Sequence, residues 1–151
     1  MTFANSLAET IIRSAQRIGQ DLDAILRPED LTLAQWRVLD ALSDGKGQSV
    51  SALAKRTSIR ISALSKLIDR MVVRSLVLRK QHADDHRIIN VMASDLGLEV
   101  HRRCAPRVQV YEEALVATCG GTDAEGTSFP AAALALHEQD WATQVQSLPE
   151  E

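Results

Sequence analysis

The fold is decided by residues 49–94, which read SVSALAKRTSIRISALSKLIDRMVVRSLVLRKQHADDHRIINVMAS. The first half of this stretch has apolar residues at helical spacing. It predicts a short helix capped by Ser49, a turn over residues 57–60 and a second helix over residues 61–74. The apolar period then shortens to that of a strand, which predicts a hairpin around the charged loop 82–87. Two helices with a tight turn and a two-stranded hairpin make a winged helix-turn-helix.

The second predicted helix has one apolar side and one side suited to DNA. A helical wheel places on the apolar side Ile61, Leu64, Leu67, Ile68, Met71 and Val72. The major groove of B-DNA admits one helix, and small or polar side chains there can reach the base edges. The predicted major-groove contacts are Ser62, Ala63, Ser65 and Lys66. Arg60 and Arg70 stand at the margins of this side and are predicted to bind phosphates.

The hairpin, with strands expected at residues 76–80 and 88–92, offers a second contact. Such a wing can place an arginine in the narrow, electronegative minor groove. Arg87 is the candidate, and Asp85 can hold its guanidinium in a charge-assisted pair. The alternative is a salt bridge within the turn, which contributes little at a surface.

The distribution of charge favours a nucleic-acid partner. Between Lys55 and Arg87 there are nine Lys or Arg residues and three Asp or Glu residues. This stretch therefore carries +6 in a chain whose net charge is −3. A basic segment within an acidic protein is typical of an electrostatic footprint for nucleic acid, although a solvated charged face has the same composition.

Composition places the chain among ordinary globular proteins, with 45% hydrophobic and 25% charged residues. No membrane-spanning run and no signal peptide are visible, which favours a cytoplasmic location. Nothing resembles a nucleophile elbow, a P-loop or a dinucleotide-binding turn, so neither catalytic residues nor a cofactor is expected. His101 and Cys104 alone are too few for a metal site, and Cys104 and Cys119 are interpreted as buried thiols.

Three amphipathic helices flank the winged region. They are expected at residues 6–26, ending before Pro28, at 95–119 and at 130–147. Further N-caps are predicted at Ser6, Thr32 and Ser94, and a kink or break is expected at Pro106. The small winged core cannot cover all three apolar stripes. The sequence therefore predicts a helical dimerisation region of residues 1–30 and 95–151 around a DNA-binding domain of residues 31–94.

The winged region resembles the MarR family of bacterial transcriptional regulators. The matching segments are Val50–Ala54, Leu64–Met71, Leu76–Arg79 and the wing signature that runs from Asp85 through Ser94 to Gly97. Ser75 stands where a glycine is usual in the family, so the turn at Ser75 is expected to be strained.

The resemblance implies a homodimer that binds a pseudo-palindromic operator in double-stranded DNA, usually as a repressor. It also implies release of the DNA by a small, often aromatic, acid. The conceivable lining residues for that effector are Trp36, Arg37, Met71 and His101. The simpler interpretation makes Trp36 a core residue and Arg37 a solvated charge.

The sequence thus predicts a mainly α (α+β) fold, a winged helix-turn-helix with a two-stranded wing and N- and C-terminal dimerisation helices. The function it predicts is sequence-specific DNA binding and transcriptional regulation. The alternative is a helical interaction protein whose winged helix binds a protein partner instead of DNA.

Overall fold

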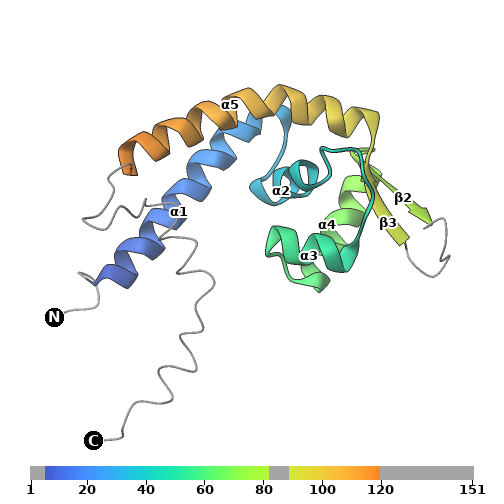
Figure 1. Cartoon of the computed structure of the whole chain (residues 1–151), viewed down its shortest axis with the longest axis horizontal. Coiled ribbons are helices and arrows are strands. Elements are labelled where there is room, and N and C mark those ends of the chain that lie inside the picture. The colour runs from blue at the N-terminus through green and yellow to red at the C-terminus, as the bar shows by residue number, and fades with distance from the viewer. Residues whose placement is uncertain (1–5, 82–88, 120–151) are drawn as a thin grey trace, which may run out of the picture. The chain divides into compact units, whose positions relative to one another are not determined.

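The computed structural model describes residues 6–81 and 89–119 (Figure 1). Along these residues the elements are α1 (Leu7–Leu26), a 3-10 turn η2 (Arg27–Glu29), α2 (Leu33–Ala41), β1 (Gln48–Ser49), α3 (Val50–Thr57), α4 (Ile61–Val73), β2 (Val77–Gln81), β3 (Ile89–Ala93) and α5 (Asp95–Cys119). The chain forms two compact units, residues 1–108 and 109–151, and α5 runs from the first into the second. The winged helix-turn-helix lies wholly in the first unit. The predicted last helix at 130–147 lies outside the described residues.

Side-chain caps begin four of the helices at the predicted residues. The hydroxyls of Ser6, Ser49 and Ser94 accept hydrogen bonds from the backbone N–H three residues later. Thr32 forms a complete capping box, because its hydroxyl accepts from Gln35 N and its own N–H donates to the Gln35 side chain. These bonds satisfy backbone groups that have no partner inside the helix, and so they fix where each helix starts.

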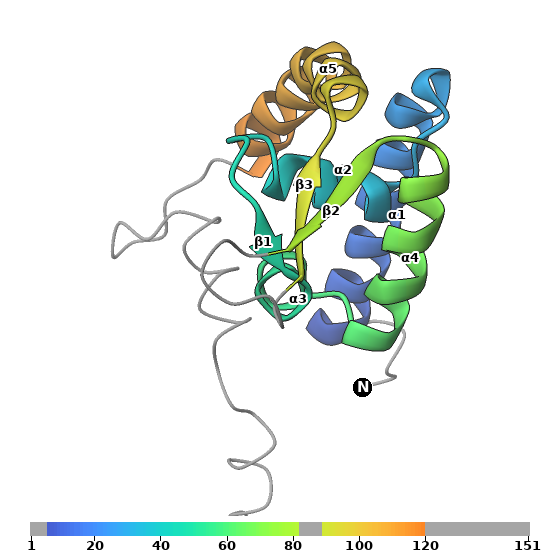
Figure 2. The ribbon, with the colours of Figure 1, turned by 90° about the vertical axis from the view of Figure 1, so that its right-hand side faces the viewer.

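The sheet has three antiparallel strands in the order β1-β3-β2 (Figure 2). The predicted hairpin is confirmed as β2 and β3, with Val77 opposite Ala93 and Gln81 opposite Ile89. The two-residue strand β1 adds to the other edge of β3, with Gln48 opposite Val91. Sequence periodicity did not predict β1, because two residues are too short to show an alternating pattern.

The core of the first unit is built from α2, α3, α4 and the sheet. Its fully buried side chains include Val38, Leu39, Leu42, Leu53, Leu64, Ile68, Met71, Val77 and Val91. Four of the six residues on the predicted apolar side of α4 are buried, namely Leu64, Leu67, Ile68 and Met71. The prediction is wrong for Ile61, which is 55% exposed, and for Val72, which is 36% exposed. Both lie at the edges of the apolar stripe, in the first and last turns of the helix, so that the neighbouring elements do not cover them.

Three helices end next to a residue other than glycine in a left-handed conformation. Asp30 after η2, Ser58 after α3 and Ser75 after α4 have φ angles of 54°, 55° and 57°. Such conformations are strained for residues with a Cβ. The strain expected at Ser75 is therefore confirmed.

Of the kink or break expected at Pro106, the break does not occur, because α5 continues through this residue. Proline removes one hydrogen bond of a helix, and the other turns of this 25-residue helix are retained. None of the helices in the described residues is long and apolar enough to span a membrane.

Candidate nucleic-acid interface

The solvent side of α4 carries the predicted base-reading residues. Ser62, Ala63 and Lys66 are exposed, and Ser65 is partly buried. They lie in the first two turns of the helix, and the same turns bury Leu64 against the core. The helix is thus anchored from behind while small and basic side chains face outward, as insertion into a groove requires.

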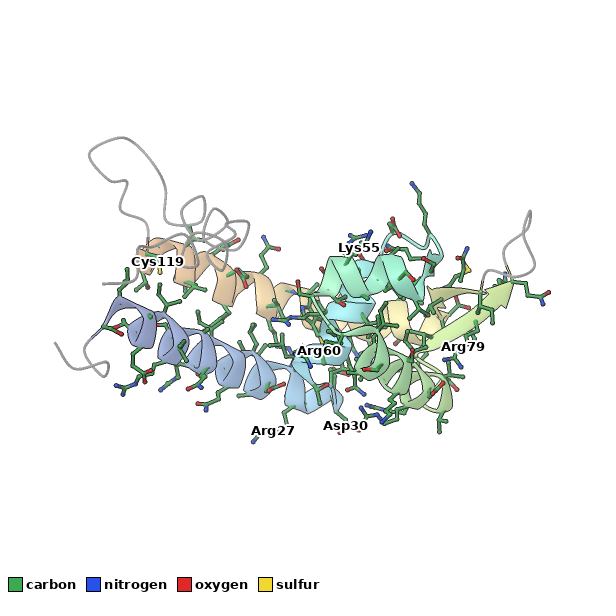
Figure 3. The ribbon with its side chains drawn as sticks, turned by 90° about the horizontal axis from the view of Figure 1, so that it is seen from below. Arg27, Asp30, Lys55, Arg60, Arg79 and Cys119 are labelled. Atoms are coloured by element: carbon green, nitrogen blue, oxygen red, sulfur yellow. The ribbon has the colours of Figure 1, made fainter. Side chains whose placement is uncertain are left out.

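Basic residues surround this part of α4. Arg60 immediately precedes the helix, is exposed and makes no side-chain cap, and Arg70 is exposed in the last turn. Lys55 and Arg56 lie exposed in the last turn of α3. Figure 3 shows Lys55 on α3 and Arg60 at the start of α4. Guanidinium and ammonium groups beside a polar helix face suit the phosphates that border a groove.

The predicted wing contact cannot be placed, because Asp85 and Arg87 lie outside the described residues. At the base of the wing, however, the structure reveals an ion pair that was not predicted. Arg79 Nη2 on β2 lies 2.7 Å from Asp69 Oδ1 on α4. This pair connects the hairpin to α4. The sequence signal was an acid on the polar side of α4 and an arginine in the next strand, a combination without a distinctive spacing.

A second set of ion pairs surrounds the link between α1 and α2. Glu29 Oε2 lies 2.9 Å from Arg103 Nη2 on α5, and Glu29 Oε1 lies 3.5 Å from Arg107. The hydrogen bond from Arg103 lowers the pKa of Glu29, and the same bond raises the pKa of Arg103. Arg74, the residue that ends α4, is paired with Asp30. These pairs were not predicted either, since they join residues far apart in the sequence.

The four residues considered for an effector have different environments. Trp36 on α2 stacks on His101 of α5 with ring centroids 4.7 Å apart and planes 4° apart. His101 Nε2 also lies 2.9 Å from Asp40 Oδ1. Arg37 is exposed, and Met71 is fully buried in the core. The structure therefore brings Trp36 and His101 together, and it places Met71 where a ligand has no access without rearrangement.

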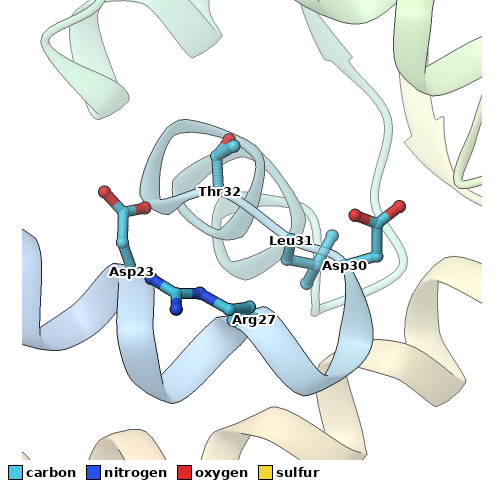
Figure 4. Close-up of a pocket in the computed structure, with 5 residues that line it drawn as sticks. All are labelled: Asp23, Arg27, Asp30, Leu31 and Thr32. Atoms are coloured by element: carbon cyan, nitrogen blue, oxygen red, sulfur yellow. The ribbon is translucent and has the colours of Figure 1, made fainter.

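Two open pockets lie away from the four residues considered for an effector. One, of about 270 Å³, is lined by Asp23, Arg27, Asp30, Leu31 and Thr32 where α1 leads into α2 (Figure 4). The other, of about 390 Å³, is lined by Asp69, Arg70, Val73 and Arg74 at the end of α4. None of the four predicted effector residues lines either pocket.

Cys104 is fully buried, and burial raises the pKa of its thiol. A raised pKa disfavours the reactive thiolate, which agrees with a structural role. Cys119 is partly exposed. No group of three or more His, Cys, Asp or Glu side chains suited to a metal ion occurs within residues 6–81 and 89–119.

Comparison with known proteins agrees with this geometry. A family model described as "MarR family" matches residues 29–88. HTH-type transcriptional repressor IacR of Pseudomonas putida is 28% identical over 83 residues, which cover 55% of this chain and 50% of IacR. The chain spans about half the length of the curated relatives it matches.

Solved structures match over nearly the whole chain. The M. tuberculosis transcriptional regulator MosR in complex with DNA has a TM-score of 0.72 at 22% identity, covering 95% of this chain and 100% of MosR. BpsR of Bordetella bronchiseptica, described with the regulation of its DNA binding by 6-hydroxynicotinic acid, has a TM-score of 0.71 at 21% identity, covering 99% of each chain. At these identities the likeness shows that the fold is shared.

Proposed function

We propose that this chain is a member of the MarR family and a homodimeric transcriptional regulator that binds a specific site in double-stranded DNA. The proposal is supported by the match of residues 29–88 to the MarR family model and by the similarity to a transcriptional repressor. The protein acts as a repressor at a pseudo-palindromic operator, and a small aromatic acid releases it. Its place of action is the cytoplasm.

The observation that carries the proposal is the two-sided α4. Its inner side is fixed by the buried Leu64, Ile68 and Met71, and its outer side presents Ser62 and Lys66 to solvent. A protein-binding surface at this place would favour exposed apolar or aromatic side chains. The small, polar and basic outer side of α4 favours DNA over the alternative of a protein partner.

The dimer is supported by apolar side chains that the first unit leaves exposed. Leu7 is 72% exposed, and Ile11 and Ile12 are 43% and 46% exposed, all in the first half of α1. A second copy can bury such a surface in a two-fold interface. In that arrangement the two α4 helices lie about 34 Å apart, one turn of DNA, and read the two halves of the operator.

A releasing ligand is supported by the relative whose DNA binding is regulated by 6-hydroxynicotinic acid. In this chain, the stacked Trp36 and His101 offer an aromatic wall, and the exposed Arg37 offers a partner for a carboxylate. Met71 contributes only if the core beside it opens, since it has no exposed surface.

The test is a footprint on the DNA upstream of the protein's own gene, followed by affinity measurements at several salt concentrations. Lys66→Ala and Arg87→Ala are each expected to weaken binding by about 1–3 kcal/mol. Lys46→Ala is the control, because it removes the same charge from the exposed turn between α2 and β1, which carries none of the proposed DNA or dimer contacts.

Equal losses in all three variants would refute the proposed contacts and leave only general electrostatic attraction. Failure of the wild-type protein to bind any of this DNA would instead favour the protein-binding alternative. Sedimentation at low micromolar concentration tests the dimer, which predicts one species of twice 16.6 kDa. Repeating the footprint with a panel of aromatic acids tests release.

A further inference from the structure

Two consecutive acidic residues between α1 and α2 reach different helices. Glu29 pairs with Arg103 and Arg107 on α5. Asp30 is held by Arg74, whose Nη1 donates to the Asp30 carbonyl oxygen at 2.7 Å and whose Nη2 lies 3.0 Å from Asp30 Oδ2. This short segment therefore connects the long helix α5 with the end of α4.

The backbone on both sides of the Asp30–Arg74 contact is tightly constrained. Asp30 adopts a left-handed conformation and donates its N–H to the Arg27 carbonyl, so its own carbonyl is turned toward Arg74. Arg74 ends α4 and precedes the left-handed Ser75. The Ser75 carbonyl then accepts a 2.5 Å hydrogen bond from Ser94 Oγ, just before α5. The C-terminal end of α4 is thus held from two directions.

We propose that Asp30 and Arg74 are positioning residues, which set the direction of α4 relative to α1 and so select the half-site spacing that the dimer accepts. This inference rests on the proposed function. Neither residue is expected to touch DNA bases, since Arg74 follows the last turn of α4 and Asp30 contacts it there, whereas Ser62 lies in the first turn.

The geometry of α4 makes a small change at its C-terminal end important at its N-terminal end. The helix has 13 residues, which corresponds to a length of about 20 Å. A tilt of about 10° at Arg74 would move the base-reading turn by about 3 Å, close to the rise of one base pair. In a dimer that reads two half-sites together, this displacement changes the preferred spacing.

The test compares Asp30→Asn with the matched control Asp21→Asn in the full-length protein. Asn tolerates the left-handed backbone of position 30 and retains the carbonyl contact, so the substitution removes only the carboxylate. Asp21 forms a 3.0 Å ion pair with Arg17 inside α1. Both variants lose one negative charge and break an ion pair, and only Asp30→Asn weakens the contact between the α1–α2 link and the end of α4.

The measurement is the affinity for the footprinted operator and for two derivatives, with the half-sites one base pair closer together or one base pair further apart. For Asp30→Asn, the preference for native over altered spacing is expected to fall by about 1.4-fold to fivefold, the range for the loss of one exposed ion pair. Binding to an isolated half-site and thermal stability should match those of Asp21→Asn. Arg74→Lys, which retains the charge but lacks the two-pronged contact, should give the same loss of preference.

Equal spacing preferences in Asp30→Asn, Arg74→Lys, Asp21→Asn and the wild-type protein would overturn the inference while leaving the proposed function intact. A loss of thermal stability with an unchanged preference would overturn it too, since the pair would then be purely structural. Failure of the wild-type protein to bind its upstream DNA would overturn both the proposed function and this inference.

Discussion

Gly97, near the start of α5, gives a prediction in which two physical effects oppose each other. Replacing a glycine inside a helix by alanine ordinarily stabilises the helix by up to about 1 kcal/mol. At Gly97, however, the new Cβ would collide with the Leu76 carbonyl oxygen and lie 3.1 Å from Leu39 Cδ2. That carbonyl already accepts the Ser94 N–H at 3.1 Å, so it cannot move without weakening this bond.

The steric conflict between the new Cβ and the Leu76 carbonyl should therefore outweigh the gain in helix propensity. Overpacking of a core costs about 1–3 kcal/mol, and weakening the Ser94 hydrogen bond costs about 1 kcal/mol more. After subtraction of the propensity gain, Gly97→Ala is expected to lower the free energy of unfolding by about 1–3 kcal/mol. Urea unfolding of the wild-type and variant proteins, followed by circular dichroism, measures the difference directly.

Gly19 supplies the matched comparison. It also lies within a helix, α1, but the nearest atom to an added Cβ is Leu33 Cδ2 at 4.0 Å, an ordinary contact. Gly19→Ala is therefore expected to raise the free energy of unfolding by up to about 1 kcal/mol. If Gly97→Ala were as stable as the wild-type protein, or shifted in the same direction as Gly19→Ala, the assignment of close packing between α5 and the turn after α4 would be refuted.

Three other substitutions or reactions test separate parts of the structure. Ser75→Gly should stabilise the protein by about 0.5–1 kcal/mol because it relieves a left-handed residue, and a lower urea midpoint would contradict this. The pKa of Glu29 is lowered by Arg103, so its carboxylate stabilises the fold above the ordinary pKa, and that contribution disappears as the pH falls through the lowered value. Glu29→Gln should accordingly reduce the fall in the free energy of unfolding between about pH 7 and pH 3. An unchanged slope of this free energy against pH would exclude the Glu29–Arg103 pair as a cause of the fall. In a thiol-labelling time course with an aromatic disulfide, Cys119 should react first, while Cys104 reacts only on unfolding; rapid labelling of both in the native protein would contradict the burial of Cys104.

The parts of the fold that depend on local sequence could be predicted. The caps at Ser6, Thr32, Ser49 and Ser94 need only a hydroxyl at the right distance from a helical run, and the change of period after Arg74 is itself a local pattern. The outer side of α4 could be predicted for the same reason, because helical spacing alone separates the buried from the exposed positions.

The contacts that connect the elements could not be predicted. The partners Asp69 and Arg79 are ten residues apart, and Asp30 and Arg74 are 44 apart. No periodicity relates such residues, and a sequence with 37 charged side chains offers many equivalent pairings. The stacking of Trp36 on His101 could not be predicted for the same reason. Both residues were predicted to line a ligand site, but only the tertiary structure shows that they contact each other.

The exposed Leu7, Ile11 and Ile12 of α1 have a consequence for how stability responds to dilution. If a second copy covers them, part of the folding free energy is association free energy and obeys mass action. The melting temperature would then rise with protein concentration, and α1 would be the first helix to fray in dilute solution. The cellular concentration of the protein would then set both the fraction of chains that are dimeric and the stability of their fold.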